Sequence, residues 1–193
     1  MMKAEYQRDV FITEIHSAAQ KSRDILFLSA DFGAPALDKF RQEIPGQFFH
    51  CGISEQHMVD MAAGLALSGK HVYVYAMAPF VTLRCIEQIK CSLALMRLPV
   101  TILAVGVGLG YADAGPTHYV TEDLACMRSL VGVQVISPAD AESTREIARL
   151  TLDNPELRVV RLERHALPGV YRSGEFNSKI GFQESYHFGF QCP

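Results

Sequence analysis

Residues 47–70 read QFFHCGISEQHMVDMAAGLALSGK, and the fold of the chain can be worked out from this stretch. The strand-like residues Gln47-Phe48-Phe49 predict a short strand, and the Ala-, Met- and Leu-rich residues 54–68 predict a helix. Ser54 is a suitable N-cap for this helix, so Glu55 falls in its first turn. Open α/β folds form their ligand sites where strands lead into helices. Glu55 is therefore the first candidate for a functional residue.

The predicted helix over 54–68 carries apolar side chains around its circumference. On one side these are Met58, Met61, Ala62 and Leu65, and on the opposite side they are Val59, Ala63, Ala66 and Leu67. A helix that is apolar all round is normally buried on all sides. This pattern predicts a helix packed between its own sheet and a second protein surface.

Composition favours one domain in a cytoplasmic protein. The chain has 193 residues, of which 49% are hydrophobic, and we expect a domain over 1–167 followed over 168–193 by a linker or arm toward an absent carboxy-terminal domain. The net charge of −3 and the lack of dense Lys/Arg clusters argue against nucleic acid as a partner. The five cysteines form no CxxC pair and are expected to be reduced. We find no signal-peptide pattern, and no apolar run reaches the ~18 residues that a membrane helix needs.

Predicted strands and helices alternate along the chain. The expected strands are 25–28, 47–49, 71–75, 100–107, 133–137 and 158–162. The expected helices are 5–21, 36–42, 54–68, 81–96, 121–130 and 138–152. Thr121 is expected to cap the fifth of these helices. The alternation predicts an α/β fold in which helices cover both faces of a mainly parallel sheet. A glycine-rich loop over 106–115 follows the most strand-like segment, at a position where function is common.

Three separated motifs carry a resemblance to a known family. They are Ser29-Ala30-Asp31, Gly52-Ile53-Ser54-Glu55-Gln56, and Gly115-Pro116-Thr117-His118 followed by Glu122-Asp123-Leu124-Ala125 and Arg128. In order and spacing they resemble the pyrimidine-binding domain of the transketolase family of thiamine-diphosphate enzymes. The resemblance covers roughly residues 5–170 and is closest to the carboxy-terminal subunit of split transketolases. It implies the thiamine-diphosphate-binding fold.

The resemblance implies catalytic roles for Glu55 and His118. In the family, the glutamate of this motif hydrogen-bonds N1′ of the cofactor's aminopyrimidine ring and favours its imino tautomer. Sharing a proton with a ring nitrogen suits a carboxyl group in apolar surroundings, although a helix N-terminus favours the anion. The alternative for Glu55 is a residue that only complements the helix dipole. His118 would contact substrate hydroxyls and handle protons, and its alternative is a loop histidine bonded to backbone.

Further cofactor and substrate contacts are implied in the same way. Asp31 and Ile53 match motif positions at the cofactor, although Asp31 could instead cap the segment that follows it. Phe80 is the best candidate to stack on the pyrimidine, with core packing as its alternative. Arg8 and Arg164 match arginines that hold the substrate phosphate, with plain surface arginines as the alternative.

Several family positions carry other residues in this chain. The family's acid before Gly-Pro-Thr-His falls at Ala114, and Asp113 one place earlier is the remaining candidate for substrate binding. The phosphate-binding histidine falls at about Gly106, and the stacking aromatics fall at Ala78 and Val81. These departures leave two alternatives open: a non-catalytic dimerisation or regulatory module of the same fold, or a fragment of a deoxyxylulose-phosphate-synthase-like enzyme.

The motif for the cofactor's other end is missing from the sequence. The family holds Mg²⁺ and the diphosphate with a Gly-Asp-Gly motif and a downstream Asn on a second domain, and no Gly-Asp-Gly occurs here. We therefore expect no metal ligands in this chain and a partner chain that holds the Mg²⁺ of thiamine diphosphate. The resemblance implies transfer of a two-carbon ketol unit between sugar phosphates by the completed enzyme. A homodimer contact through the helix over 54–68 is also expected.

The purified chain alone should bind thiamine diphosphate poorly and transfer no two-carbon unit, because its sequence supplies only the pyrimidine half of the site. A coupled assay with a ketose phosphate donor and an aldose phosphate acceptor, run with and without a diphosphate-binding partner chain, measures this. Turnover by the purified chain alone would contradict the expectation.

Overall fold

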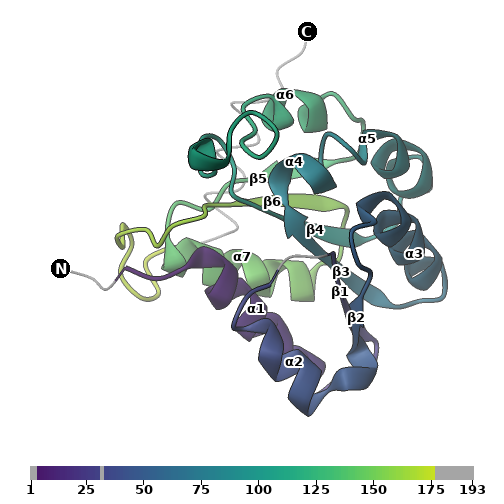
Figure 1. The fold of residues 1–193 in the computed structure, drawn as a ribbon. Helices are drawn as coiled ribbons and strands as arrows, with labels where there is room; N and C mark the ends of the chain where they lie inside the picture. Colours follow the sequence, from purple (N-terminus) through teal and green to yellow (C-terminus); the bar gives the residue numbers. More distant parts are fainter. Residues whose placement is uncertain (1–3, 31–32, 177–193) are drawn as a thin grey trace, which may run out of the picture.

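The computed structural model describes residues 4–30 and 33–176 of the chain. Within these residues, six strands form one sheet in the order β2-β1-β3-β4-β6-β5 (Figure 1). The strands are β1 Ile25–Ser29, β2 Phe48–His50, β3 His71–Met77, β4 Val100–Val105, β5 Gln134–Ile136 and β6 Arg158–Leu162. Every neighbouring pair is parallel. The predicted α/β class is confirmed, and the sheet is wholly parallel.

Helices cover both faces of the sheet, as the sequence predicted. One face carries α1 Gln7–Ala19, α2 Leu37–Glu43 and α7 Ala141–Asp153. The other face carries α3 Glu55–Leu67, α4 Ala78–Val81, α5 Ile86–Gln88, the π-helix Ile89–Ala94 and α6 Asp123–Arg128. Short 3-10 turns lie at Pro45–Gln47 and Ala112–Ala114. No helix among the described residues is long and apolar enough to cross a membrane.

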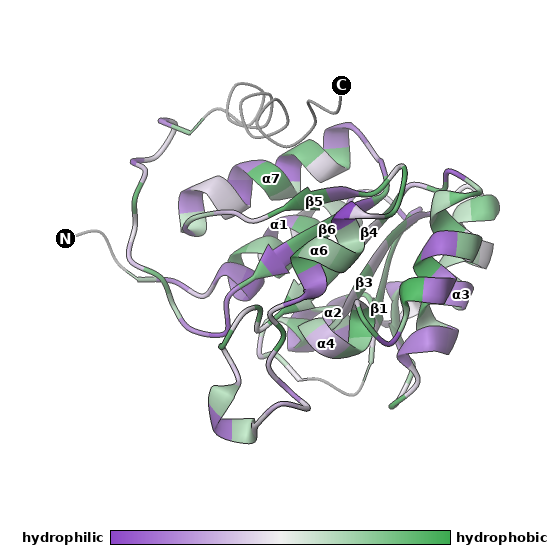
Figure 2. Cartoon of the chain, turned by 90° about the horizontal axis from the view of Figure 1, so that it is seen from above, coloured by the Kyte–Doolittle hydropathy of each residue, from purple (hydrophilic) through white to green (hydrophobic). Residues whose placement is uncertain are grey.

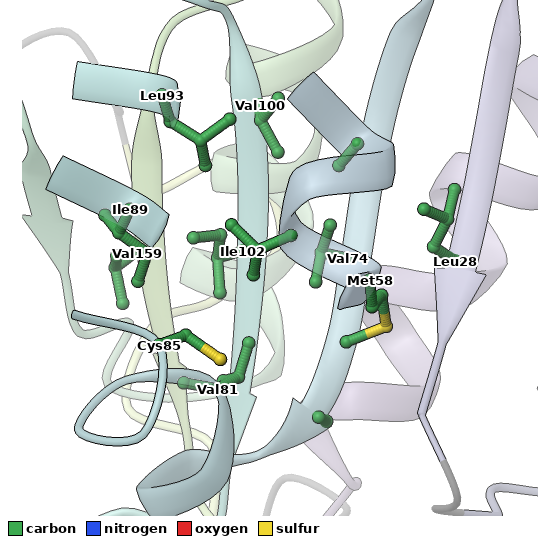
Figure 3. Packing of buried hydrophobic residues seen from close by; sticks show 14 of the residues in the cluster. Leu28, Met58, Val74, Val81, Cys85, Ile89, Leu93, Val100, Ile102 and Val159 are labelled. Carbon is green, nitrogen blue, oxygen red and sulfur yellow. The ribbon is translucent and has the colours of Figure 1, made fainter. Parts of the chain in front are cut away.

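Each face of the sheet has its own apolar core. On the α3 side, Leu28, Val74 and Ile102 come from neighbouring strands in register and face Met58 of α3 (Figure 3). On the other side, aromatic rings dominate, and Phe27 stacks on Tyr73 with 6.4 Å between ring centroids. Because both faces are covered, the central strands are apolar at nearly every position.

Helix α3 buries only one of its faces within this chain. Met58, Val59 and neighbouring small residues pack on the sheet. The outward face carries Gln56, His57, Asp60, Gly64 and Leu67, which are exposed. Figure 2 shows polar and apolar residues side by side along α3. The expectation that this helix is apolar all round is wrong, because three polar residues share its outer face. A partner on that face stays a prediction.

The helix predicted over 81–96 is interrupted in the structure. α4 ends at Val81, residues 82–85 form a turn, and α5 continues into the π-helix. The hydroxyl of Thr82 donates to the carbonyl oxygen of Ala78 at 2.6 Å. Such back-bonding by Thr often bends helices, and here it falls at the residue that caps the end of α4.

Two of the predicted helix starts also differ in detail. Thr121 does not cap α6, because Glu122 takes the N-cap position and accepts a bond from the backbone N–H of Thr121 at 2.8 Å. Ser54 occupies the N-cap position of α3, but its hydroxyl donates to the carbonyl oxygen of Cys51 instead of capping the helix. The chain's clearest cap is Asp140, whose carboxylate accepts from Ser143 N–H at 2.9 Å at the start of α7.

The buried amide of Gln7 fastens the first turn of α1 to the carboxyl edge of the sheet. Its nitrogen donates to the carbonyl oxygen of Pro138, beyond β5, at 2.7 Å. Its oxygen accepts from the backbone N–H of Glu163, beyond β6, at 2.8 Å. Since the strands are parallel, their carboxyl ends and the loops that follow them meet at this edge.

The first residues after the predicted domain dock on α7. The carboxylate of Asp140 accepts the backbone N–H groups of Val170 and Tyr171 at 2.7 and 2.8 Å. Phe176 packs against the apolar core on the α1 side. Residues 177–193, where most of the expected linker falls, lie outside the described residues, so the boundary at 167 stays a prediction.

Gln7→Ala should lower the free energy of unfolding by roughly 2 to 4 kcal/mol, because Pro138 and Glu163 would each keep a buried backbone group without its partner. Urea unfolding followed by circular dichroism measures this. Gln20→Ala is the control: this exposed glutamine bonds Glu43 at the surface, and the change should stay within about 0.5 kcal/mol. Equal losses in both variants would contradict the role of Gln7.

Candidate functional site

Glu55 lies at the carboxyl edge of the sheet, in the first turn of α3. Its side chain is only 5% exposed, and its Oε2 atom accepts a hydrogen bond from Nη1 of Arg84 at 2.7 Å. A buried carboxylate needs such a partner, because an unpaired charge in an apolar environment is costly. Arg84 itself is 41% exposed, so the guanidinium lies between Glu55 and the solvent side of the site.

Phe80 and His118 continue the chain of contacts that begins at Glu55. The guanidinium carbon of Arg84 lies 4.3 Å from the ring centroid of Phe80. The Phe80 ring meets the imidazole of His118 edge-on, with 5.4 Å between centroids. His118 Nδ1 lies 2.8 Å from the hydroxyl of Thr117. We call Glu55, Phe80, Arg84 and His118 the carboxylate cluster.

The carboxylate cluster brings together three residues that the sequence singled out. Glu55 comes from α3, Phe80 from α4 and His118 from the loop after β4. Ala78 and Val81, the family's usual aromatic positions, are fully buried in the core, whereas Phe80 is half-buried at the site. In this chain the aromatic ring of the cluster thus comes from the position between them.

Sequence reasoning missed Arg84. It lies in the turn at 82–85, inside the segment predicted as continuous helix. Two signals could have found it: it stands four residues after Phe80, and a buried Glu55 requires a basic partner. The helical pattern of the sequence does not reveal this turn.

A second group of side chains surrounds Tyr111 in the loop after β4. The guanidinium of Arg164, just beyond β6, lies 4.3 Å from the centroid of the Tyr111 ring and donates to the carbonyl oxygen of Gly110 at 3.1 Å. Arg164 also forms an ion pair with Asp113. We call Arg8, Tyr75, Tyr111, Asp113 and Arg164 the arginine cluster.

Electrostatics tie Arg8 to this second cluster. Burial raises the pKa of Tyr111, and the positive charges of Arg164 and Arg8 lower it in part. Burial also raises the pKa of Tyr75 in β3, against the effect of Arg8. The hydrogen bond from Arg164 lowers the pKa of the exposed Asp113 carboxyl. Three of the four residues assigned to substrate binding, Arg8, Asp113 and Arg164, therefore share one cluster.

The ring of Tyr111 occupies the space beside Gly106, the position at which the family resemblance placed a phosphate-binding histidine. Gly106 has φ of +80°, and a Cβ atom built on it would lie 2.0 Å from Cε2 of Tyr111. A larger residue would have to displace the ring. Tyr111 thus fills the space next to Gly106, and the sequence offered no signal for it because this contact depends on how the loop folds back.

The remaining predicted cofactor residues are Asp31 and Ile53. Asp31 lies outside the described residues. Ile53 precedes α3 and is 76% exposed, so its side chain is available for contacts with a second molecule.

Comparison with known proteins identifies the family. The family model described as "Transketolase, pyrimidine binding domain" matches residues 6–170. The chain belongs to the transketolase family. Over 175 residues it is 38% identical to one of the subunits of the apulose-4-phosphate transketolase of Phocaeicola vulgatus, a match that covers 90% of the chain and 56% of that relative. It is 34% identical to 1-deoxy-D-xylulose-5-phosphate synthase of Corynebacterium diphtheriae, over 82% of the chain and 25% of that enzyme.

A solved structure supports the same assignment for the transketolase domain. A split-gene transketolase, described as an inactive β4 tetramer, superposes with a TM-score of 0.78 at 31% identity. The match covers 91% of this chain and 57% of that chain. The chain thus spans little more than half the length of a similar split transketolase chain. Family membership implies thiamine diphosphate as the cofactor.

The carboxylate cluster fits the pyrimidine end of thiamine diphosphate. The guanidinium of Arg84 is a planar group that donates an N–H to Glu55 and lies over Phe80, so this space accepts a flat, nitrogen-bearing group. For Mg²⁺, the described residues include no group of three or more His, Cys, Asp or Glu side chains that could hold a metal ion.

Cys85 follows Arg84 directly in the sequence, and its side chain lies in the apolar core beside Val81 (Figure 3). Its thiol donates to the carbonyl oxygen of Phe80 at 3.2 Å. Burial, reinforced by the negative charge of Glu55, raises the pKa of this thiol to about 12. The thiolate is the reactive form of cysteine, so Cys85 should be inert in the folded chain.

Iodoacetamide at pH 8 should modify the exposed Cys91 and leave Cys85 unmodified, as measured by mass spectrometry of the digested chain. In 8 M urea, chosen to unfold the chain, both thiols should react. Labelling of Cys85 in the folded chain at the rate of Cys91 would contradict the burial of the Cys85 thiol.

Proposed function

We propose that this chain is the pyrimidine-binding half of a thiamine-diphosphate-dependent transketolase. Paired with a chain that binds the diphosphate, it transfers a two-carbon ketol unit between sugar phosphates. The observation that carries the proposal is the buried Glu55 carboxylate, which lies with an aromatic ring and a histidine at the carboxyl edge of a parallel sheet.

Each residue of the carboxylate cluster has a role in this proposal. Glu55 holds a proton at N1′ of the aminopyrimidine, a task that suits a carboxyl group shielded from water. Phe80 offers a ring face on which the pyrimidine stacks. His118 contacts the substrate hydroxyls and moves a proton to or from them. Thiamine diphosphate, when bound, supplies the carbanion chemistry of the two-carbon transfer.

The arginine cluster is proposed to hold the phosphate group of the sugar. Arg164 and Arg8 both act on the space around Tyr111, and guanidinium groups bind phosphate through paired N–H donors. The ion pair between Arg164 and Asp113 is exposed, so it costs little to open when an anion arrives. Asp113 would then be free to contact a substrate hydroxyl.

A partner chain is part of the proposal. It would hold Mg²⁺ and the diphosphate, for which the sequence of this chain has no Gly-Asp-Gly motif. The outer face of α3 is the proposed contact, including a contact between two copies of this chain. Exposed Ile53 and Leu67 lie just before α3 and at its end, and they would supply apolar anchors at the rim of that face. Asp31 and Ile53 are proposed to lie next to the cofactor in the assembled enzyme.

A non-catalytic module of the same fold is the second candidate. It is favoured by the packing of Tyr111 against Gly106, at the position of the family's phosphate-binding histidine. A deoxyxylulose-phosphate-synthase-like activity is a further variant of the catalytic proposal and would use the same Glu55. Loss of two-carbon transfer in a Glu55 variant of the reconstituted enzyme would favour the two catalytic functions over the non-catalytic module.

Glu55→Gln should reduce two-carbon transfer by the reconstituted enzyme at least about 100-fold, because the amide cannot share a proton with the ring nitrogen. The measurement is turnover of this chain mixed with its diphosphate-binding partner, thiamine diphosphate, Mg²⁺ and a ketose phosphate. Glu87→Gln makes the same change at an exposed position and should leave turnover unaltered. Full activity of Glu55→Gln, with folding confirmed by circular dichroism, would refute the role of Glu55.

A further inference from the structure

In the structure, the Glu55 carboxylate pairs with a side chain of the same chain. The carboxylate is bound to Arg84 at 2.7 Å, and the same guanidinium lies over Phe80 at 4.3 Å. A carboxylate oxygen and an aromatic face are the two contacts that the aminopyrimidine would use in the proposed function. Arg84 therefore already makes, within the free chain, the contacts assigned to the cofactor's ring.

The two sides of this ion pair differ in their access to water. The Glu55 side chain is 5% exposed and cannot exchange its partner for bulk solvent without cost. Arg84 is 41% exposed, and its long stem can carry the guanidinium into water without desolvation. While it is ionised, Glu55 thus needs a hydrogen-bond donor, whereas Arg84 does not need Glu55.

The backbone around Arg84 is held in place, so only the Arg84 side chain needs to move to open the site. It lies in the turn between α4 and α5, where its backbone N–H donates to the carbonyl oxygen of Pro79 at 3.2 Å. Phe80 remains anchored because α4 follows β3 directly and its neighbours Pro79 and Val81 are buried. A rotation of the Arg84 side chain would vacate the face of Phe80 and leave both ring and carboxylate in place.

We propose that Arg84 is the resident occupant of the pyrimidine site and that it competes with the aminopyrimidine for Glu55 and Phe80. The inference rests on the proposed function, since it takes that ring as the ligand of the carboxylate cluster. Arg84 keeps Glu55 paired and the cluster formed until the cofactor arrives, and it lowers the affinity of the free chain for the ring. Breaking a half-exposed ion pair and a cation–π contact should reduce the affinity of the free chain for the pyrimidine about tenfold.

The test uses the full chain without its partner and the cofactor's pyrimidine fragment, 4-amino-5-hydroxymethyl-2-methylpyrimidine, as the probe. Affinity is measured by ligand-observed NMR titration, a readout that does not require catalysis. Arg84→Met removes the charge and keeps an apolar stem of similar reach. Arg23→Met is the matched control, because Arg23 is an exposed arginine in the turn before β1, at the opposite end of the sheet.

Arg84→Met should bind the pyrimidine about tenfold more tightly than the wild-type chain, and Arg23→Met should bind like wild type. The affinity of Arg84→Lys should fall between those two values, because its ammonium group still pairs with Glu55 but has no planar guanidinium to stack on Phe80. An Arg84→Met chain that binds no more tightly than wild type, or no detectable binding in either, would overturn the proposal.

A double variant tests whether the gain passes through Glu55. In Glu55→Gln the ion pair is already lost and only the contact of Arg84 with Phe80 remains, so adding Arg84→Met should increase the affinity clearly less than tenfold. An undiminished tenfold gain in that background would show that Arg84 acts elsewhere, which contradicts the competition. Urea unfolding of each variant confirms that the comparison is made between folded chains.

Failure of the Arg84 competition can be distinguished from failure of the proposed function. If Glu55→Gln abolishes turnover of the reconstituted enzyme but Arg84→Met does not tighten pyrimidine binding, the function stands and only the competition is wrong. If Glu55→Gln leaves turnover intact, the proposed role of Glu55 fails, whatever Arg84 does.

Discussion

The ion pair between Glu55 and Arg84 is the contact around which the open edge of the sheet is organised. Glu55 is held in the first turn of α3, where burial shields it from water and makes a charged partner necessary. Its partner comes from the turn over residues 82–85, which begins where Thr82 bonds back to Ala78. The same guanidinium reaches Phe80, which meets His118. One buried charge thus links three segments that the sheet brings to a common edge.

Polar side chains buried behind this edge hold the remaining segments in place. Gln7 bonds the backbone beyond both β5 and β6, which positions the neighbouring Arg8 near Tyr75. Asp123 in α6 binds Arg161 of β6 through two contacts of 2.8 and 3.2 Å. Asp140 caps α7 and fastens residues 170–171. The parallel sheet makes the edge, and these buried bonds fix the loops on it.

Much of the fold followed from local sequence signals. The strands predicted over 100–107 and 158–162 are rich in Val, Ile and Leu because both faces of a parallel strand are covered, and the structure confirms them as β4, which ends at Val105, and β6. The errors fall where side chains compete with the backbone. Thr82 interrupts a helical pattern, and Glu122 displaces the expected cap at Thr121. The outer face of α3 was predicted to be apolar because Ala, Met and Leu are abundant in this helix, but polar residues such as Asp60 lie on it.

The sequence by itself determined the order of strands and helices, the alternation that makes the sheet parallel, and the family to which the motifs belong. These features depend on neighbouring residues and on periodic burial, so they leave a local record. Only the tertiary structure decided that Arg84 pairs with Glu55, 29 positions away, and that Arg164 and Tyr111 stack beside Gly106. Contacts between distant segments depend on how loops fold over the sheet edge, so the sequence could at most suggest a basic partner for Glu55 and could not fix which residue it is.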